Sequence, residues 1–122
     1  MDTYIVIEPW KETYPNPLVI FRGQEVMVDK SKVDDNPEWK GWVWCVSADN
    51  SGWVPLQILT LVEETDTHLW RASVNEDYSA KELTVEIDDR VEGKKKLNGW
   101  IWCHLIDEDE YGWLPLSNLE KI

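Results

Sequence analysis

Tryptophan is the residue type through which this chain could bind a ligand, since 9 of its 122 residues are Trp. Three of them lie close together, in Gly-Trp-Val-Trp-Cys at 41–45 and Gly-Trp-Val-Pro-Leu at 52–56. An indole ring stacks on apolar groups such as proline rings, and its face attracts Lys and Arg. Nine rings exceed what small cores readily hold, so we expect some to line a ligand groove or a contact between parts of the protein.

The pattern around these residues occurs twice. Residues 99–103 read Gly-Trp-Ile-Trp-Cys and residues 112–116 read Gly-Trp-Leu-Pro-Leu, at offsets of 58 and 60 residues from the first occurrence. Unequal offsets indicate two copies of one unit with different loop lengths. We therefore expect one domain over residues 1–62 and a second over residues 68–122. The acidic stretch 63–67 is the expected linker, short enough to restrict the orientation of the domains without fixing it.

Hydrophobic periodicity predicts β-strands throughout the chain, at 4–7, 25–28, 42–46, near 74, 83–85 and 100–105. Clusters of Pro, Gly, Asn and Asp separate these runs, which is typical of small all-β barrels. Within 42–46, alternation places Trp42 and Trp44 on one face and Val43 and Cys45 on the other. Because Val and Cys suit a core, both indoles are expected to face outward.

The charge of the chain limits its partners. A net charge of −12 repels phosphate backbones and anionic membrane surfaces, so we expect neither nucleic acid nor membrane as a partner. A cationic protein or peptide would be attracted.

The N-terminus has no basic segment before an apolar run and no stretch is long enough to cross a bilayer, which indicates a cytoplasmic protein. Cys45 and Cys103 hold the same position in the two copies, as expected of two buried, reduced thiols.

Sequence motifs of catalysis and metal binding are missing. There is no Gly-x-Ser-x-Gly, His-Glu-x-x-His, phosphate loop or Cys-x-x-Cys. His68 and His104 are not spaced as metal ligands, and Cys103 and His104 would point to opposite faces of a strand. We expect no enzyme activity, no metal and no cofactor.

Several motifs of the second copy resemble the Src-homology-3 (SH3) family. Residues 74–80 resemble its Ala-Leu-Tyr-Asp-Tyr opening, 83–85 its next strand, 99–103 its Gly-Trp-Trp strand and 112–115 its Gly-Tyr-Val-Pro. The first copy follows the same order, with 6–10, 17–20 and 22–25 ahead of its Trp motifs. The resemblance covers nearly the whole chain, twice, and is to tandem variant SH3 domains of bacterial proteins of unknown role. It implies an all-β fold of two tandem SH3-like small β-barrels.

The resemblance also implies a binding site in each copy. SH3 domains bind extended, proline-rich peptides in an aromatic groove, beside an acidic loop that holds a Lys or Arg. The residues that correspond to this groove and loop in the first copy are Trp10, Trp42, Trp53 and Pro55, with Glu12, Asp34 and Asp35. Those in the second copy are Tyr78, Trp100, Trp113 and Pro115.

Both copies depart from the family at the groove. Glu8 and Glu76 stand where the family has a stacking Tyr, and Ile58 and Asn118 replace its last groove Tyr. We therefore expect a non-catalytic module that binds an extended, basic or proline-containing peptide, mainly through the first copy. The alternative is a structural protein whose Trp faces form an interdomain or homodimer interface. The sequence leaves open the partner's identity and whether the protein is a monomer or a dimer.

Overall fold

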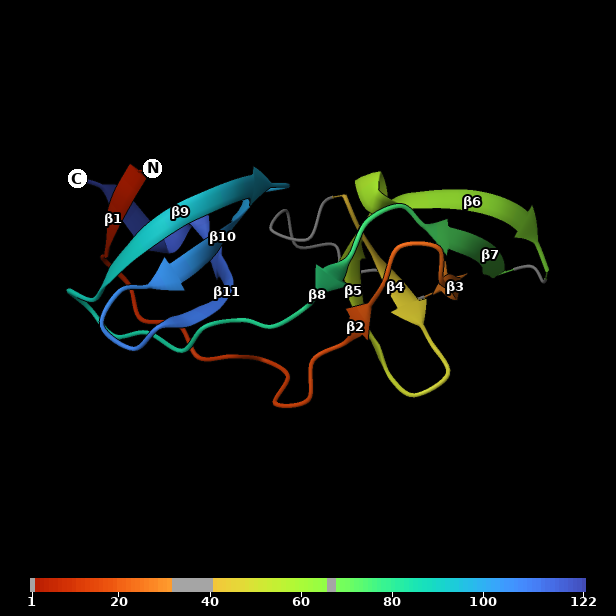
Figure 1. Cartoon of the computed structure of the whole chain (residues 1–122), viewed down its shortest axis with the longest axis horizontal. Helices are drawn as coiled ribbons and strands as arrows, with labels where there is room; N and C mark the ends of the chain where they lie inside the picture. Colours follow the sequence, from red (N-terminus) through yellow and green to blue (C-terminus); the bar gives the residue numbers. More distant parts are fainter. Residues whose placement is uncertain (1, 32–40, 66–67) are drawn as a thin grey trace. The chain divides into compact units, whose positions relative to one another are not determined.

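The computed structural model describes residues 2–31, 41–65 and 68–122 (Figure 1). Over these residues the protein is all-β, which confirms the expected fold class. The strands are β1 (Asp2–Val6), β2 (Val19–Ile20), β3 (Glu25–Asp29), β4 (Trp42–Val46), β5 (Ser51–Pro55), β6 (Leu59–Glu64), β7 (Leu69–Val74), β8 (Tyr78–Ser79), β9 (Arg90–Leu97), β10 (Trp100–Leu105), β11 (Glu110–Pro115) and β12 (Leu119–Lys121). Two short 3-10 turns, η2 (Leu56–Ile58) and η3 (Leu116–Asn118), follow the Gly-Trp-x-Pro motifs. None of the described segments forms a helix long and apolar enough to span a membrane.

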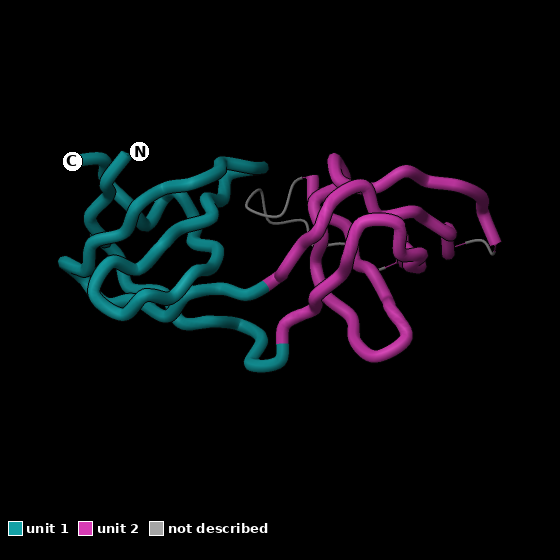
Figure 2. Tube along the Cα trace, in the orientation of Figure 1, with its two compact units in different colours: residues 1–16, 81–122 teal, residues 17–80 magenta. Residues whose placement is uncertain are grey.

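The chain forms two compact units that do not follow the division expected from the repeat. Unit 1 consists of residues 1–16 and 81–122, and unit 2 is the continuous stretch 17–80 (Figure 2). The expected linker 63–67 lies within unit 2. Its first two residues, Glu63 and Glu64, end strand β6, which pairs with β7 as a hairpin. Residues 66 and 67 lie outside the described residues.

Each unit contains a five-stranded antiparallel sheet with the same strand arrangement. The order is β11-β10-β9-β1-β12 in unit 1 and β5-β4-β3-β7-β6 in unit 2. In each sheet, the first strand of one copy lies next to the last strand of the other copy. Val6 of β1 opposes Leu119 of β12, and Val74 of β7 opposes Leu59 of β6.

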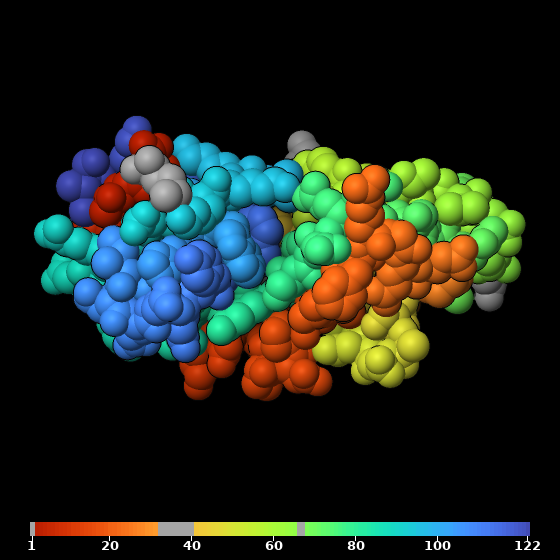
Figure 3. All heavy atoms as spheres, in the orientation of Figure 1, coloured from red at the N-terminus to blue at the C-terminus, as the bar shows by residue number. Residues whose placement is uncertain are grey.

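The two copies exchange these opening strands within the chain. Strand β1 opens the first copy but completes the sheet of the second, and the space-filling view shows its red atoms beside the dark blue C-terminus (Figure 3). Strand β7 opens the second copy but completes the sheet of the first. The exchange continues beyond the strands, since Trp10 bridges Val85 and Tyr78 pairs with Ile20. Each unit thus combines the opening segment of one copy, residues 2–16 or 69–80, with the remaining strands of the other.

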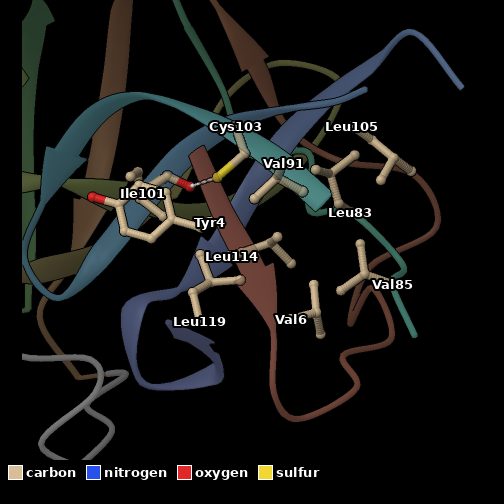
Figure 4. Packing of buried hydrophobic residues seen from close by; sticks show 10 residues of the cluster. All are labelled: Tyr4, Val6, Leu83, Val85, Val91, Ile101, Cys103, Leu105, Leu114 and Leu119. Carbon is tan, nitrogen blue, oxygen red and sulfur yellow. Dashed lines mark hydrogen bonds between the residues drawn. The ribbon is translucent and has the colours of Figure 1, made fainter. Parts of the chain in front are cut away.

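Alternate residues of the strands form the cores. In unit 1, side chains of β1 meet those of β9, β10 and β11 (Figure 4), and the members of this cluster are Tyr4, Val6, Leu83, Val85, Val91, Ile101, Cys103, Leu105, Leu114 and Leu119. The buried apolar residues of unit 2 include Leu18, Ile20, Val26, Val28, Cys45, Val54, Ile58, Leu59, Ala72 and Val74. Both cysteines are free and buried, as predicted, and burial raises the pKa of Cys45 and Cys103 to about 12.

Candidate functional site: two aromatic faces

Strand alternation positions the tryptophans of unit 1 on the side of the sheet away from the core. Ile101 and Cys103 of β10 are buried in the core cluster, so Trp100 and Trp102 extend to the other face. Strand β11 adds to that face, because Trp113 opposes Trp102 across the ladder. The Trp102 and Trp113 rings lie edge to face, with centroids 5.4 Å apart at 69°.

Trp10 joins this face from the exchanged opening segment. Its ring lies edge to face on Trp100, with centroids 5.4 Å apart at 84°. Pro115 opposes Trp100 on the neighbouring strand. Trp100 and Trp113 are buried, whereas Trp10 and Trp102 are half-buried and are the two indoles that a ligand could reach. The unit 1 aromatic face consists of Trp10, Trp100, Trp102, Trp113 and Pro115.

A buried carboxylate anchors the segment that carries Trp10. The indole Nε1 of Trp10 donates to Glu82 Oε1 across 2.9 Å, and the same oxygen accepts from the amide and the hydroxyl of Thr13 at 3.2 and 3.0 Å. Glu82 is only 6% exposed. Burial raises the pKa of Glu82, while the hydrogen bonds from Trp10 and Thr13 act in the opposite direction. Glu82 therefore holds residues 10–13 in place and is not available to a cation in solvent.

Asn118 secures the preceding part of the segment. Its side-chain Nδ2 donates to the carbonyls of Glu8 and Pro9 at 3.3 and 3.2 Å, and its carbonyl accepts from the Ile7 amide at 2.9 Å. The residue thus orients the chain that leads to Trp10.

Unit 2 has a matching aromatic face made of Trp42, Trp44, Trp53, Pro55 and Tyr78. Trp42 opposes Pro55 and Trp44 opposes Trp53. The Trp44 and Trp53 rings are 5.2 Å apart at 78°, and the hydroxyl of Tyr78 donates to the Trp53 carbonyl at 3.0 Å. Trp44 is half-buried, whereas Trp42, Trp53 and Tyr78 are at most 9% exposed.

Glycine begins each Gly-Trp-x-Pro motif because another segment crosses closely there. A Cβ at Gly112 would lie 2.9 Å from backbone atoms of Glu82 and Leu83. A Cβ at Gly52 would lie 3.0 Å from the Cβ of Leu18. Because glycine has no side chain, the start of each motif can pack directly against a neighbouring segment of the same unit, at residues 82–83 for Gly112 and at Leu18 for Gly52.

The structure regroups the residues expected to bind. The family resemblance implies that Trp10 and Glu12 lie with Trp42 and Trp53, but Trp10 lies on Trp100, and the Glu12 amide donates to the Thr84 hydroxyl at 3.1 Å. Tyr78, expected beside Trp100, is bonded to Trp53 instead. The exchange of opening segments causes both differences. Asp34 and Asp35 lie outside the described residues.

Two residues of the site were not identified as such from the sequence. Neither Glu82 nor Thr13 is among the groove and loop residues that the family resemblance implies. Their roles depend on a contact between residues 69 positions apart, for which no local pattern exists. A polar Lys81-Glu82 pair reads as surface in any local window.

Other polar clusters do not join the aromatic faces. His104 Nε2 lies 2.9 Å from Asp109 and its ring stacks on Tyr111, so the three form a local contact at the β10–β11 hairpin. Arg71 lines a hollow on unit 2, where it is bonded to Glu25 at 2.9 Å and lies 3.4 Å from Glu63. In the part of the chain that the structure describes, no three His, Cys, Asp or Glu side chains are grouped as a metal site would require.

No family model, curated protein or solved structure matches this chain. The geometry of the two aromatic faces is therefore the basis on which we assign a function.

Proposed function

We propose that the protein is a non-catalytic binding module of two SH3-like barrels that captures an extended peptide on the unit 1 aromatic face. The observation that carries the proposal is the edge-to-face contact of half-buried Trp10 with buried Trp100. A second half-buried indole, Trp102, is supported in the same way by Trp113. Rings held by other rings are rigid, so a ligand that stacks on them orders few side chains when it binds.

The exchange of opening segments favours unit 1 as the main binding unit. It brings Trp10 to the second copy's Trp100, which adds a fourth indole to this face. Unit 2 has Tyr78 at the corresponding place, and Tyr78 is 9% exposed with its hydroxyl bonded to Trp53. Proline rings and aliphatic side chains are the apolar groups of an extended peptide that fit beside exposed indole edges and faces.

The charge of the protein favours a basic peptide. The net charge of −12 attracts cations at a distance, and Glu8 and Glu12 lie on the segment that carries Trp10. A Lys or Arg of the ligand could then contact a carboxylate and an indole at once. Glu82 is excluded from this role because it is only 6% exposed and its Oε1 already accepts from Trp10 and Thr13. Affinity of about 1–100 μM is expected for a small, open site of this kind.

The experiment that tests this function is an NMR titration of the indole N–H signals with basic, proline-containing peptides. Saturable shifts are expected at Trp10 and Trp102. Peptides with Glu in place of Lys or Arg should bind more weakly. Matched variants at corresponding positions, Trp102→Ser in unit 1 and Trp44→Ser in unit 2, should separate the two faces, with binding lost only in the first. Indole signals that no peptide moves would contradict the proposal.

A structural role is the second candidate, because most of the predicted groove residues are buried within the chain itself. Trp42, Trp53, Trp100 and Trp113 are each at most 8% exposed. In that case the half-buried Trp44 and Trp102 would contact a second copy. Light scattering distinguishes the two candidate functions. If the native protein is a dimer and Trp102→Ser or Trp44→Ser converts it to a monomer, the structural role is favoured. If the native protein is a monomer, peptide binding is favoured.

A further inference from the structure

The two opening segments occupy equivalent positions in their units. Tyr4 of β1 opposes Val91 of β9, and Ala72 of β7 opposes Val26 of β3 in the same register. The backbone pairing alone would therefore accept either segment in either unit. A pairing without exchange, each segment with the strands of its own copy, is the competing arrangement.

Core side chains of unit 1 require a small residue beside a large one. Tyr4 is 4% exposed and its ring covers Gly93. A Cβ at Gly93 would lie 2.8 Å from Tyr4 Cε2 and 2.5 Å from Ile101 Cδ1. The ring of Tyr4 and the side chain of Ile101 both occupy space that is open because residue 93 has no side chain.

In unit 2 the small residue is on the opening segment and the larger one is on the strand beside it. The residue that corresponds to Gly93 is Val28, since Gly93 opposes Asp2 and Val28 opposes Trp70. Val28 is fully buried, and the opening segment presents the fully buried Ala72 at the position of Tyr4. Without exchange, the Tyr4 ring would meet the Val28 side chain in one unit. Ala72 would lie beside Gly93 in the other and leave a cavity in place of a ring.

Hydrogen bonds favour the same exchanged pairing of segments and units. Glu82 accepts three hydrogen bonds from Trp10 and Thr13. Its counterpart in unit 2 is Pro17, because Leu83 and Leu18, the next residues, each lie against the glycine of a Gly-Trp-x-Pro motif. A proline side chain cannot accept the indole N–H, and Tyr78 has a single hydroxyl to offer a buried carboxylate. Exchange is thus the arrangement in which the buried carboxylate of Glu82 accepts hydrogen bonds from Trp10 and Thr13.

We propose that these two fits, Tyr4 on Gly93 and Trp10 with Thr13 on Glu82, make residues 81–122 a docking site that selects the opening segment 2–16 and rejects the segment 69–80. The partner of this docking site is the chain's own N-terminus. The repeat would permit both pairings, and the matched residues decide between them. Exchange of equivalent segments is the basis of domain swapping, which here takes place within one chain.

Cysteine cross-links in the full chain distinguish the two pairings. Ile5 opposes Glu120 in the structure, and Thr60 is the residue that corresponds to Glu120, because it opposes Ser73. Mild oxidation of monomeric Ile5→Cys/Glu120→Cys should form an internal disulfide in most molecules, and Ile5→Cys/Thr60→Cys should form at least tenfold less. The buried thiols of Cys45 and Cys103, with pKa values of about 12, should not compete. Preferential formation of the 5–60 link would overturn the proposal.

Reversal of the sizes tests the selection itself. Tyr4→Ala combined with Ala72→Tyr gives each segment the residue suited to the other unit, and should lower the ratio of 5–120 to 5–60 links at least tenfold. An unchanged ratio in a folded protein would show that these residues do not select the segment.

A double-mutant cycle gives an answer even if the reversed variant does not fold. The loss in denaturation midpoint caused by Gly93→Ala should be smaller in a Tyr4→Ala background than in the native protein, and the contact of the added Cβ with Ile101 accounts for the loss that remains. Val28→Ala with Tyr4→Ala is the matched control and should be additive, because Val28 packs against the other segment. Coupling of Tyr4 to Val28 instead of Gly93 would refute the inference.

Discussion

The indole nitrogen of Trp10 donates a 2.9 Å hydrogen bond to the carboxylate of Glu82, a residue 72 positions later in the chain. The contact joins the two pieces of unit 1 and also orients the ring that lies on Trp100. Stability of the unit and presentation of its aromatic face therefore depend on the same carboxylate.

Removal of this carboxylate should destabilise unit 1. Glu82→Ala leaves the buried donors of Trp10 and Thr13 without their acceptor, and we expect a loss of about 1–3 kcal/mol in the free energy of unfolding. Urea denaturation measures this loss, and the indole signal of Trp10 should move towards its position in unfolded protein. Glu86→Ala, an exposed carboxylate in the same segment, is the control and should change stability by less than about 0.5 kcal/mol. Equal losses in the two variants would argue against a structural role for Glu82.

The contribution of Glu82 to stability should fall as the pH rises. Burial raises the pKa of Glu82 above its ordinary value of 4.5, so in the interval between the unfolded and folded pKa values the folded state binds the proton more tightly. Below that interval Glu82 is protonated in both states and is not penalised. Above it the folded state holds a buried charge. Urea midpoints between pH 4 and pH 7 should therefore fall more steeply with rising pH for the native protein than for Glu82→Gln. Parallel curves would contradict the prediction.

The two thiols should be inert in the folded protein. Burial raises the pKa of Cys45 and Cys103 to about 12, so almost no thiolate is present at pH 8, and neither sulfur is accessible. A colorimetric thiol reagent should react with both residues in concentrated urea but with neither over minutes in native buffer. Rapid reaction of either thiol without denaturant would show that its unit opens readily.

Two neighbouring tryptophans should separate folding from binding. Trp113 is 6% exposed and Trp113→Ala should reduce the free energy of unfolding by about 3–5 kcal/mol. Trp102 is half-buried against it, so Trp102→Ala should lose only about 1 kcal/mol while it removes an indole from the proposed binding face. Thermal denaturation and peptide titration of the two variants test the distinction. Full peptide binding by a folded Trp102→Ala variant would exclude Trp102 from the site.

Local sequence patterns determined the β character of the chain and the faces of its strands. Alternation in Gly-Trp-x-Trp-Cys predicted inward Cys45 and Cys103, and the structure buries both thiols. These features depend on the period of a strand and on the size of neighbouring side chains, so a window of a few residues contains them. The repeat likewise predicted two related domains, and the structure has two five-stranded sheets with the same strand arrangement.

The tertiary structure alone decided which opening segment completes which unit. The two copies have nearly the same local pattern, so strand propensity and turn positions are equally consistent with an exchanged and an unexchanged chain. The choice depends on residues that meet only after folding, such as Tyr4 with Gly93 and Trp10 with Glu82. Steric fit and hydrogen bonding act at a few ångströms in space and are independent of separation along the chain, which is why the sequence pattern did not reveal them.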